Sequence, residues 1–540
     1  MPTLRLDVVS PLPPVRSGIA DYIADLLPSL MALDEAPDVR LVHLPGQPVD
    51  PALAARYPIV ETEEFLSPSP GRPRLPLYQM GNNRYHEAVL ALAMARPGVL
   101  ALHDVVLHHL LLDITLGRDT FPPYRECLRA DHGWIGAAAA NAKKWHAYGA
   151  APVFSLPAHR TLLARQRGVL VHSAWAEGMV REENPGVRVR AIPMGIPLPP
   201  PAAPGAGAAL RARLGLPPDA PVVGSFGFQT PIKRTELAIA ALAAPALERV
   251  HLLIVGQAAE VMDLEGAARR AGVAERVHVA GFLPYADFEA AIAATDLCLN
   301  LRYPTAGETS ASLLRVLAVG RPAIVSDYAQ FADLPAEIAV KVPLAATAEE
   351  ESAALAAALG ELLADRARLA AMGEAARAYV AARHAPAAAA RAVVDACREW
   401  EGAAPLEDAP GAPAVPAPST IAWHQMPGEI EVRGAEAPWP AGERRRLAIR
   451  LRNTGFARWL AGDRGPGGLA LSLKLFFEGE DLLEGRRWLA FPRDVAPGEE
   501  VRFETEIRRP PGPARLRIEP HLFGGLSFSF LGGPWWEEDL

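Results

Sequence analysis

The stretch Val222-Val-Gly-Ser-Phe-Gly-Phe-Gln-Thr-Pro-Ile-Lys-Arg-Thr-Glu236 decides the fold class. An apolar run is followed by a glycine-containing loop, and a helical pattern begins just after Lys233 and Arg234. This order of strand, turn and helix is the unit from which parallel sheets are built. Cations at the start of a helix oppose its dipole unless an anion lies between them and the backbone N–H groups. The stretch therefore predicts a βα unit with an anion-binding loop; a solvated basic pair is the alternative.

The same alternation extends in both directions from this stretch. Short apolar runs alternate with Ala/Leu-rich helical patterns from residue 3 to about residue 345, which predicts an α/β protein with parallel sheets. The Pro-rich segment 191–201 separates two series of βα units. We therefore expect two Rossmann-like domains, at residues 1–195 and 196–400, that face each other across a cleft. The expected strands are 4–9, 41–44, 75–79, 98–103, 168–172, 221–225, 251–255, 277–280, 297–301 and 322–326.

The pattern changes toward the C-terminus. Residues 348–400 are rich in Ala, Glu and Arg and predict long helices, interrupted near Met372-Gly373 and at 384–386. Residues 401–420 have the composition of a Pro/Ala linker. Beyond it, apolar and polar residues alternate between Gly/Pro turns, which predicts an all-β sandwich over residues 421–540. The alternating runs are 447–451, 469–477, 501–507 and 515–518.

Composition narrows the class of protein. The 540 residues carry a net charge of −8, so nucleic acid, which requires clustered cations, is not expected as a partner. The three cysteines lie far apart and offer neither a disulfide framework nor a CxxC metal site, which fits a reducing, cytoplasmic compartment. Residues 1–10 predict a strand and not a signal peptide. Lysine is rare, with five in the chain, so the position of Lys233 is notable.

Two further loops resemble the 222–236 stretch, because each follows a strand and is followed by the start of a helix. Gly18 precedes a helix after the first strand, and the N–H groups of such a helix favour an anionic oxygen; an ordinary βα loop is the alternative. Glu308, Thr309 and Ser310 follow strand 297–301 at the start of another helix. First-turn N–H groups there can receive phosphate oxygens, and a simple N-cap is the alternative.

A fourth loop carries imidazole chemistry. His103 and Asp104 end strand 98–103, where an imidazole can hydrogen-bond a sugar hydroxyl and a carboxylate can fix its tautomer or cap the next helix. Because His108 and His109 follow closely, a His/Asp metal cluster is the alternative. We expect no metal, since no carboxylate has the usual ligand spacing and the chain has no Asp-x-Asp pair.

Together these loops resemble those of the retaining, nucleotide-sugar-dependent glycosyltransferases of the GT-B fold, family 4. The resemblance covers roughly residues 1–400 and rests on the order and spacing of its motifs. In that family the last helix crosses back onto the first domain, which suits residues 387–400. The motifs are Ser17-Gly-Ile-Ala-Asp-Tyr22, Leu102-His-Asp104, Val171-His-Ser173, Ile192-Pro-Met-Gly195, the loop from Gly227 to Lys233, Gly281-Phe-Leu-Pro-Tyr285, the segment from Gly307 to Pro322, and Val325-Ser-Asp327.

The resemblance implies a role for each matching residue. Lys233 matches the lysine that contacts the donor diphosphate, in the loop that Gly227 opens. His103 matches the histidine near the transferred sugar, and Glu308 matches the first glutamate of the Glu-x7-Glu motif, which contacts that sugar. Gly18 matches the N-terminal glycine loop. Thr309 and Ser310 would contribute to the donor site from the start of the same helix as Glu308.

This chain departs from the family pattern at two places. Phe228 stands where the family usually has an arginine before the lysine, so Arg234 or Arg302 would have to replace it. Arg315 stands where the second glutamate should hold the ribose hydroxyls, and the spacing is one residue shorter. The nucleotide therefore cannot be named from the sequence.

The resemblance implies a hexosyltransferase (EC 2.4) that uses a nucleotide-diphosphate sugar and needs no cofactor. The implied acceptor is a glycan or lipid-linked molecule of polysaccharide or cell-surface glycan biosynthesis, with association at the inner face of the membrane left open. Asp104, Asn82 and Asn83 lie on the expected acceptor side. A catalytically silent nucleotide-sugar or glycan-binding scaffold remains an alternative, as does an epimerase or phosphorylase of the same fold.

The C-terminal region carries no evident chemistry. Asn453-Thr-Gly455 with Trp459, followed by Gly/Pro turns, resembles Ig-like modules appended to bacterial surface-polysaccharide enzymes. The aromatic residues Trp535, Trp536, Phe528 and Phe530 are candidates for binding a glycan or a protein, with core or edge positions as the alternative.

Overall fold

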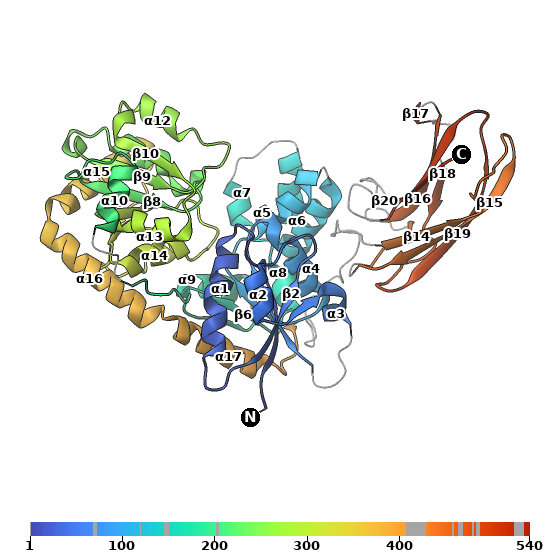
Figure 1. Ribbon diagram of the computed structural model, residues 1–540, viewed down its shortest axis with the longest axis horizontal. Coiled ribbons are helices and arrows are strands. Elements are labelled where there is room, and N and C mark those ends of the chain that lie inside the picture. The colour runs from blue at the N-terminus through green and yellow to red at the C-terminus, as the bar shows by residue number, and fades with distance from the viewer. Residues whose placement is uncertain are drawn as a thin grey trace.

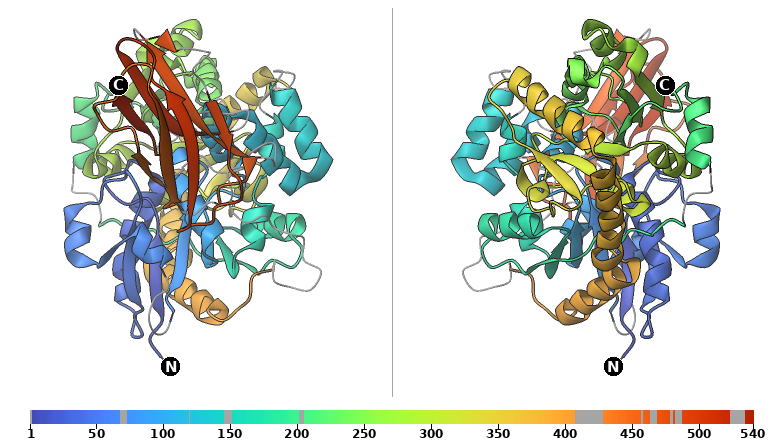
Figure 2. Two further views of the ribbon diagram at one scale, coloured as in Figure 1. Left: turned by 90° about the vertical axis from the view of Figure 1, so that its right-hand side faces the viewer. Right: turned by 90° about the vertical axis from the view of Figure 1, so that its left-hand side faces the viewer.

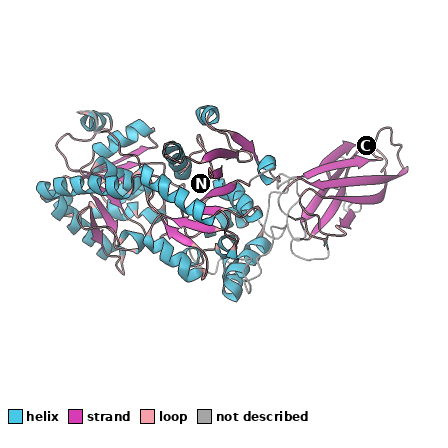
Figure 3. Ribbon diagram, turned by 90° about the horizontal axis from the view of Figure 1, so that it is seen from below, coloured by secondary structure: helices cyan, strands magenta, loops and turns pink. Residues whose placement is uncertain are grey.

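The computed structural model contains two helix-covered parallel sheets and an antiparallel region whose described residues form no α-helix (Figures 1 and 3). This composition confirms the expected α/β class and the C-terminal β-structure. The described residues are 2–67, 73–118, 120–144, 151–200, 205–406, 428–455, 458–462, 468–477, 480–481, 487–522 and 534–540. Most of the expected linker, as well as Phe528 and Phe530, lies outside these ranges. None of the helices within them is long and apolar enough to cross a membrane.

The first sheet has seven parallel strands in the order β3-β2-β1-β4-β5-β6-β7. Its strands are buried on both faces: Leu6 and Val8 of β1 enter one core, and Val9 enters the other. The three-residue strands β3 and β7 of this sheet, like the four-residue strand β13 (Ala339–Val342) of the second sheet, were not predicted because they are too short to show clear periodicity. The strands are β1 (Arg5–Val9), β2 (Asp38–His43), β3 (Ile59–Glu61), β4 (Leu75–Met80), β5 (Val99–Leu102), β6 (Gly168–Val171) and β7 (Val189–Ala191). The helices are α1 (Gly18–Met31), α2 (Pro51–Arg56), α3 (Thr62–Leu66), α4 (Glu87–Ala95), α5 (His108–Ile114), α6 (Phe121–Lys144), α7 (Ala151–Ser155), α8 (Arg160–Ala164) and α9 (Ala174–Glu183).

The second sheet has six parallel strands in the order β10-β9-β8-β11-β12-β13. In the first sheet β1 lies between β2 and β4, and in the second sheet β8 lies between β9 and β11. The connections on the two sides of each of these strands therefore run in opposite directions, and α/β folds bind ligands at the carboxyl ends of the strands at such a point. The strands are β8 (Val222–Phe226), β9 (His251–Val255), β10 (Val277–Gly281), β11 (Leu297–Asn300), β12 (Ala323–Ser326) and β13 (Ala339–Val342). The helices are α10 (Ala206–Arg213), α11 (Thr235–Ala241), α12 (Leu264–Arg270), α13 (Tyr285–Ala293), α14 (Ala311–Val319) and α15 (Ala348–Ala364). Short 3₁₀ segments lie at Arg84–His86, Leu116–Arg118, Pro231–Lys233 (η3), Pro245–Leu247, Ala274–Arg276 and Ala329–Phe331.

One of the two expected interruptions in the 348–400 region was misplaced. The helices α16 (Arg366–Arg383) and α17 (Pro386–Trp400) do separate at 384–385, but the other break is at Asp365 and not near Gly373. The Asp365 carboxylate accepts a hydrogen bond from Arg368 N at 2.9 Å and so begins α16. Gly373 lies inside α16, where a Cβ would come within 2.4 Å of the Gly320 carbonyl oxygen. The glycine therefore allows close packing and does not end the helix.

Helix α17 returns to the first sheet, as the resemblance implied (Figure 2). Trp400 is buried against Gly168 at the start of β6, where an added Cβ would lie 2.1 Å from the indole. Glu399 pairs with Arg190 at 2.5 Å, and Arg398 pairs with Glu35 at 2.6 Å. The C-terminal helix thus ties the second α/β unit to the first.

The C-terminal strands form two antiparallel sheets that share one core, which Leu447 and Leu471 enter from opposite sides. This arrangement is a sandwich. Its likeness to Ig-like modules stays a prediction. The strands are β14 (Gly428–Arg433), β15 (Arg444–Asn453), β16 (Leu469–Phe477), β17 (Glu480–Asp481), β18 (Arg487–Ala490), β19 (Glu500–Arg508), β20 (Ala514–Leu522) and β21 (Trp536–Asp539).

Candidate functional site

His103 follows the end of β5 and is almost fully buried. Its Nε2 lies 2.8 Å from Gln79 Oε1, so Nε2–H donates and Nδ1 of the neutral ring is an acceptor. The ring packs edge-on against Tyr22 at 4.9 Å, and the His172 ring lies at the same distance. Burial, followed by the nearby imidazoles of His172 and His86, lowers the pKa of His103 well below its ordinary value. The side chain is therefore a neutral, rigidly oriented imidazole.

Asp104 is the next residue and is also enclosed. Burial and the nearby Glu308 carboxylate raise its pKa to about 7, against the opposing hydrogen bond that Asn82 N donates at 2.9 Å. The amide of Asn82 contacts His109 Nδ1 at 3.1 Å and accepts from Leu110 N at 2.9 Å. Asn83 accepts from Tyr85 N at 3.1 Å and so begins a 3₁₀ turn. Both asparagines thus hold the first sheet's loops together; an acceptor role for them stays a prediction.

Lys233 lies at the end of η3, behind the loop that follows β8. Its ammonium group donates to the Phe226 carbonyl at the end of that strand. Gly227 has a φ of +90°, and a Cβ there would lie 2.8 Å from Lys233 Nζ. Burial, and then the charge of Arg302, lower the pKa of Lys233 well below its ordinary value, while Glu308 opposes them. The loop therefore places a desolvated amine at the carboxyl end of the central strand.

Glu308 is fixed by the loop that follows β11. Its Oε1 lies 3.2 Å from Nε of the buried Arg302, and its Oε2 accepts from Thr305 Oγ1 at 2.9 Å and Ala306 N at 3.0 Å. Gln330 holds the Glu308 carbonyl at 2.6 Å. Because every oxygen of this residue has a partner, its carboxylate has one defined position.

The start of α14 lies beside this carboxylate. Ser310 caps the helix by accepting from Leu313 N at 3.2 Å, and it donates to Asn300 Oδ1 at 2.9 Å. The Nδ2 atom of Asn300 is buried without a hydrogen-bond partner among the described residues. Thr309 is half-buried just before the cap. The two alternatives given for Ser310, an N-cap and a contribution to phosphate binding, are therefore compatible. Ser310 is the N-cap of α14, and it lies beside the unpaired Nδ2 of Asn300.

The loops of the two α/β units touch each other directly. Val106 N donates to Ala306 O at 2.9 Å, and a Cβ on Gly307 would lie 2.8 Å from Val105. Arg315 of α14 pairs with Asp25 of α1 at 2.7 Å. The structure thus brings His103, Asp104, Lys233 and Glu308 into one region, and it engages Arg315 with the opposite unit.

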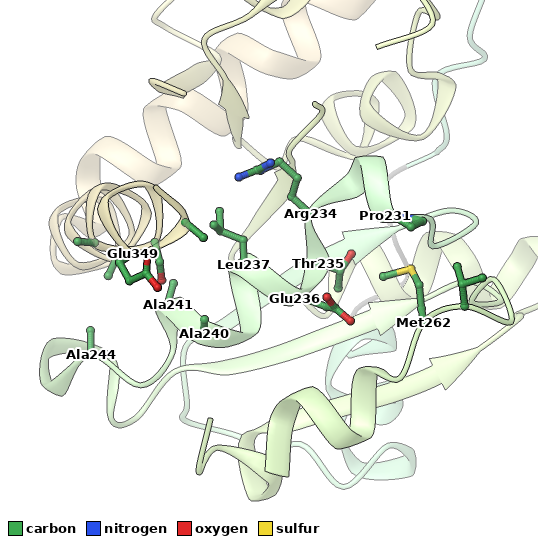
Figure 4. Close-up of a pocket in the computed structure, with 15 residues that line it drawn as sticks. Pro231, Arg234, Thr235, Glu236, Leu237, Ala240, Ala241, Ala244, Met262 and Glu349 are labelled. Carbon is green, nitrogen blue, oxygen red and sulfur yellow. The ribbon is translucent and has the colours of Figure 1, made fainter. Parts of the chain in front are cut away.

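Arg234 pairs with a residue of another helix, and its guanidinium also lies 5.8 Å from the ring of Tyr303 in the loop that follows β11. It has a left-handed φ of 54°, and its guanidinium pairs at 2.5 Å with the buried Glu351 of α15. It borders a pocket of about 670 Å³ between α11 and α15, in which alanine is the most frequent lining residue (Figure 4). This pocket is separate from the loop region around Glu308. Gly18 begins α1 with open space around it, and Ser17 caps that helix.

His172 was expected only as part of the Val171-His-Ser173 motif, without a role of its own, and Gln79 was not expected at the site. His172 follows β6 as His103 follows β5, and this equivalence is the signal that could have found it. Gln79 lies within a wholly buried strand, where a lone amide gives no local signal. No group of three or more His, Cys, Asp or Glu residues in the described ranges is arranged to hold a metal ion.

Two sheets with helices on their faces, a crossover helix and facing loops define the GT-B class of glycosyltransferases. Residues 218–365 match the family model of glycosyl transferases group 1, which places the enzyme among the glycosyltransferases. No curated protein matches the chain.

Solved structures share the fold at low sequence identity. Sucrose-phosphate synthase from Thermosynechococcus elongatus is 18% identical with a TM-score of 0.52; the match covers 74% of the present chain and 99% of the synthase. Anabaena Alr3699/HepE in complex with UDP is 16% identical with a TM-score of 0.51, over 73% and 100% of the two chains. Its complex with UDP-glucose is 15% identical over the same shares, with a TM-score of 0.50.

Proposed function

We propose that this glycosyltransferase moves a hexosyl group from a nucleotide-diphosphate sugar to a hydroxyl of a glycan or lipid-linked acceptor, with retention and without a metal ion. The observation that carries the proposal is the convergence of Lys233, Arg302 and the start of α14 at the carboxyl ends of β8 and β11. The complexes of Alr3699/HepE with UDP and UDP-glucose support a nucleotide-sugar donor on this fold.

The electrostatics favour a diphosphate at this position. Arg302 is buried and Lys233 is half-buried, and the charge of Arg302 lowers the pKa of Lys233 while the Glu308 carboxylate raises it. A diphosphate carries the negative charge that would relieve this repulsion and restore the protonated amine. The unpaired Asn300 Nδ2 and the first N–H groups of α14 add neutral donors. As the glycosidic bond breaks, these fixed groups would stabilise the charge on the leaving nucleoside diphosphate.

In this proposal, residues of the first α/β unit contact the sugar that is transferred. His103 presents Nδ1 as an acceptor, and Asp104 lies near enough to Glu308 for their charges to interact. Glu308 and His103 would position the sugar, and the acceptor hydroxyl would attack on the face from which the diphosphate leaves. We place the reaction in the cytoplasm, at the inner membrane face when the acceptor is lipid-linked, in polysaccharide or cell-surface glycan synthesis.

The test measures thermal stabilisation by UDP, GDP, ADP and TDP, followed by sugar transfer from the matching nucleotide sugars. A nucleotide at about a hundred times its Kd should stabilise the wild type by about 2.7 kcal/mol. Lys233→Ala should abolish this shift and lower transfer by about 10²–10³-fold, because it removes one charge-stabilising donor. Lys341→Ala is the matched control: Lys341 also donates to a backbone carbonyl, that of Ala332, but from β13.

A catalytically silent scaffold is the second candidate. Phe228 and Arg315 motivate it, since Arg315 is already engaged by Asp25 at 2.7 Å. Nucleotide binding without transfer to any acceptor would favour the scaffold. Stabilisation by none of the four nucleotides would refute the donor site itself.

A further inference from the structure

The outward face of the sheet formed by β16, β18, β20 and β21 carries one row of unusual composition. Leu471 and Leu473 enter the sandwich core, so Ser472 between them faces outward. Ser472 is paired with Trp488 of β18 on one side and with Glu519 of β20 on the other. The pairing of β20 with β21 ends at Ile518 and Trp536, which places Trp535 beside Glu519. We call Trp488, Ser472, Glu519 and Trp535 the tryptophan row.

The ends of the tryptophan row are exposed and its middle is buried. Trp488 is 49% exposed and Trp535 is 51% exposed, whereas Ser472 and Glu519 are 0% and 2% exposed. Both indoles are held in place: Trp488 packs edge-on against His521 at 4.9 Å, and the Arg517 guanidinium lies 4.9 Å from the Trp535 ring. The row therefore consists of two supported aromatic platforms that bracket a polar floor.

The floor offers both donors and acceptors. Glu519 Oε1 lies 3.1 Å from Lys474 Nζ and 3.5 Å from Arg517 Nε. The Ser472 hydroxyl is buried and has no hydrogen-bond partner among the described residues. A buried hydroxyl without a partner is unfavourable, and a ligand that supplies one relieves this cost. This hydroxyl is the second observation, besides the exposed indoles, that points to a ligand.

The charges of the described side chains on this face balance. Lys474, Arg515 and Arg517 are cationic, and the paired acids are Glu519, Glu537 and Asp539. Arg515 lies 2.7 Å from Asp539 and 3.1 Å from Glu537, while Arg517 lies 3.7 Å from Glu537. A face with no excess of either sign does not select an anionic polymer or a phospholipid surface.

We infer that the tryptophan row binds a neutral oligosaccharide. The C–H faces of pyranose rings are apolar and match flat indoles, and their hydroxyls can both donate to Glu519 and accept from Lys474 or Arg517. The indoles stand three strand spacings apart, or about 14 Å, which calls for several linked sugars and not one. This inference rests on the sandwich alone and is independent of the proposed sugar transfer.

The test measures binding of the full-length chain to immobilised neutral oligosaccharides with α- and β-linked glucose, mannose and galactose, beside sulfated and carboxylated polysaccharides. Intrinsic tryptophan fluorescence then gives the Kd of each binder. We expect at least one neutral oligosaccharide to bind, with tenfold or greater loss for Trp488→Ala and for Trp535→Ala. Ser472→Ala should also weaken binding while leaving thermal stability unchanged or higher, an outcome that a purely structural role would not produce.

Arg446→Ala is the matched control, because it removes an exposed side chain from the outward face of the other sheet of the sandwich. It should leave binding unchanged. The inference is overturned if no neutral oligosaccharide binds, if only anionic polymers bind, or if neutral binding survives both tryptophan substitutions. Because these measurements need no nucleotide, their failure would be distinct from failure of the donor site.

Discussion

The carboxyl ends of the two parallel sheets carry different chemistry. The first sheet presents groups that burial keeps uncharged, such as His103 and His172, whose pKa values are lowered, and Asp104, whose pKa is raised. The second sheet presents the buried guanidinium of Arg302 and the fixed carboxylate of Glu308, beside the half-buried amine of Lys233, whose pKa is lowered. The same βα architecture therefore provides a neutral surface on one side and a charged one on the other. In the proposed reaction, the neutral side faces the sugar and the charged side receives the diphosphate.

The largest expected effect is on the pH dependence of stability, and it concerns Asp104 at the neutral carboxyl end of the first sheet. The folded-state pKa of Asp104 is about 7, whereas the ordinary value is 3.8. Between these values the folded chain holds a proton that the unfolded chain has released. The resulting stabilisation is full below pH 4 and is lost as the pH rises through about 7. Asp104→Asn removes this titration, so the difference in unfolding free energy between wild type and variant should change by on the order of 4 kcal/mol from pH 4 to pH 7.

Urea unfolding of both proteins at several pH values measures this difference. Asp113→Asn serves as control, since Asp113 also has a raised pKa but is exposed, and it should give a smaller change. A difference curve that is flat between pH 4 and pH 7 for Asp104→Asn would show that the carboxyl is charged throughout, and the contrast between the two sheets would then fail.

The charged side is tested by its two arginines. Arg302→Ala should raise the Kd of the stabilising nucleotide by about tenfold or more, because charged hydrogen bonds contribute about 1.5–3 kcal/mol. Arg234→Ala should leave that Kd nearly unchanged and lower the unfolding free energy by about 3 kcal/mol, because it leaves the buried Glu351 unpaired. Calorimetric titration and urea unfolding separate the two effects. If both variants lost nucleotide affinity equally, Arg234 would also contribute to donor binding.

The general architecture could be predicted because periodicity and turn residues report local structure. All ten strands expected in the α/β region are present, including 251–255 with the same bounds. The sequence also located the loops of Lys233 and Glu308, since a strand end followed by a helix start can be recognised locally. Three strands were not predicted, namely β3, β7 and β13; they have three, three and four residues, which is too few to show a clear period.

The partners of charged residues could not be predicted in the same way. Arg234 looks like part of the anion loop in sequence, yet Glu351, 117 residues later, determines where its guanidinium lies. Arg315 is separated from Asp25 by 290 residues, and their pairing depends on how the two units meet. Local patterns place a side chain on an element, whereas packing between distant elements decides which charge it contacts.

The smallest expected effect concerns Gly227, which packs against the side chain of Lys233. Gly227→Ala and Gly272→Ala both put a side chain at positive φ, +90° and +70°, so each should cost about 1 kcal/mol of stability. The new Cβ lies 2.8 Å from Lys233 Nζ in the first variant and in open space in the second. Because the amine must shift, Gly227→Ala alone should also raise the nucleotide Kd by about fivefold, or about 1 kcal/mol. Calorimetric titration of both variants measures this difference. Equal Kd values would mean that the position of Nζ beside the Phe226 carbonyl does not matter for binding, and the charged side would then depend on Arg302 and the start of α14.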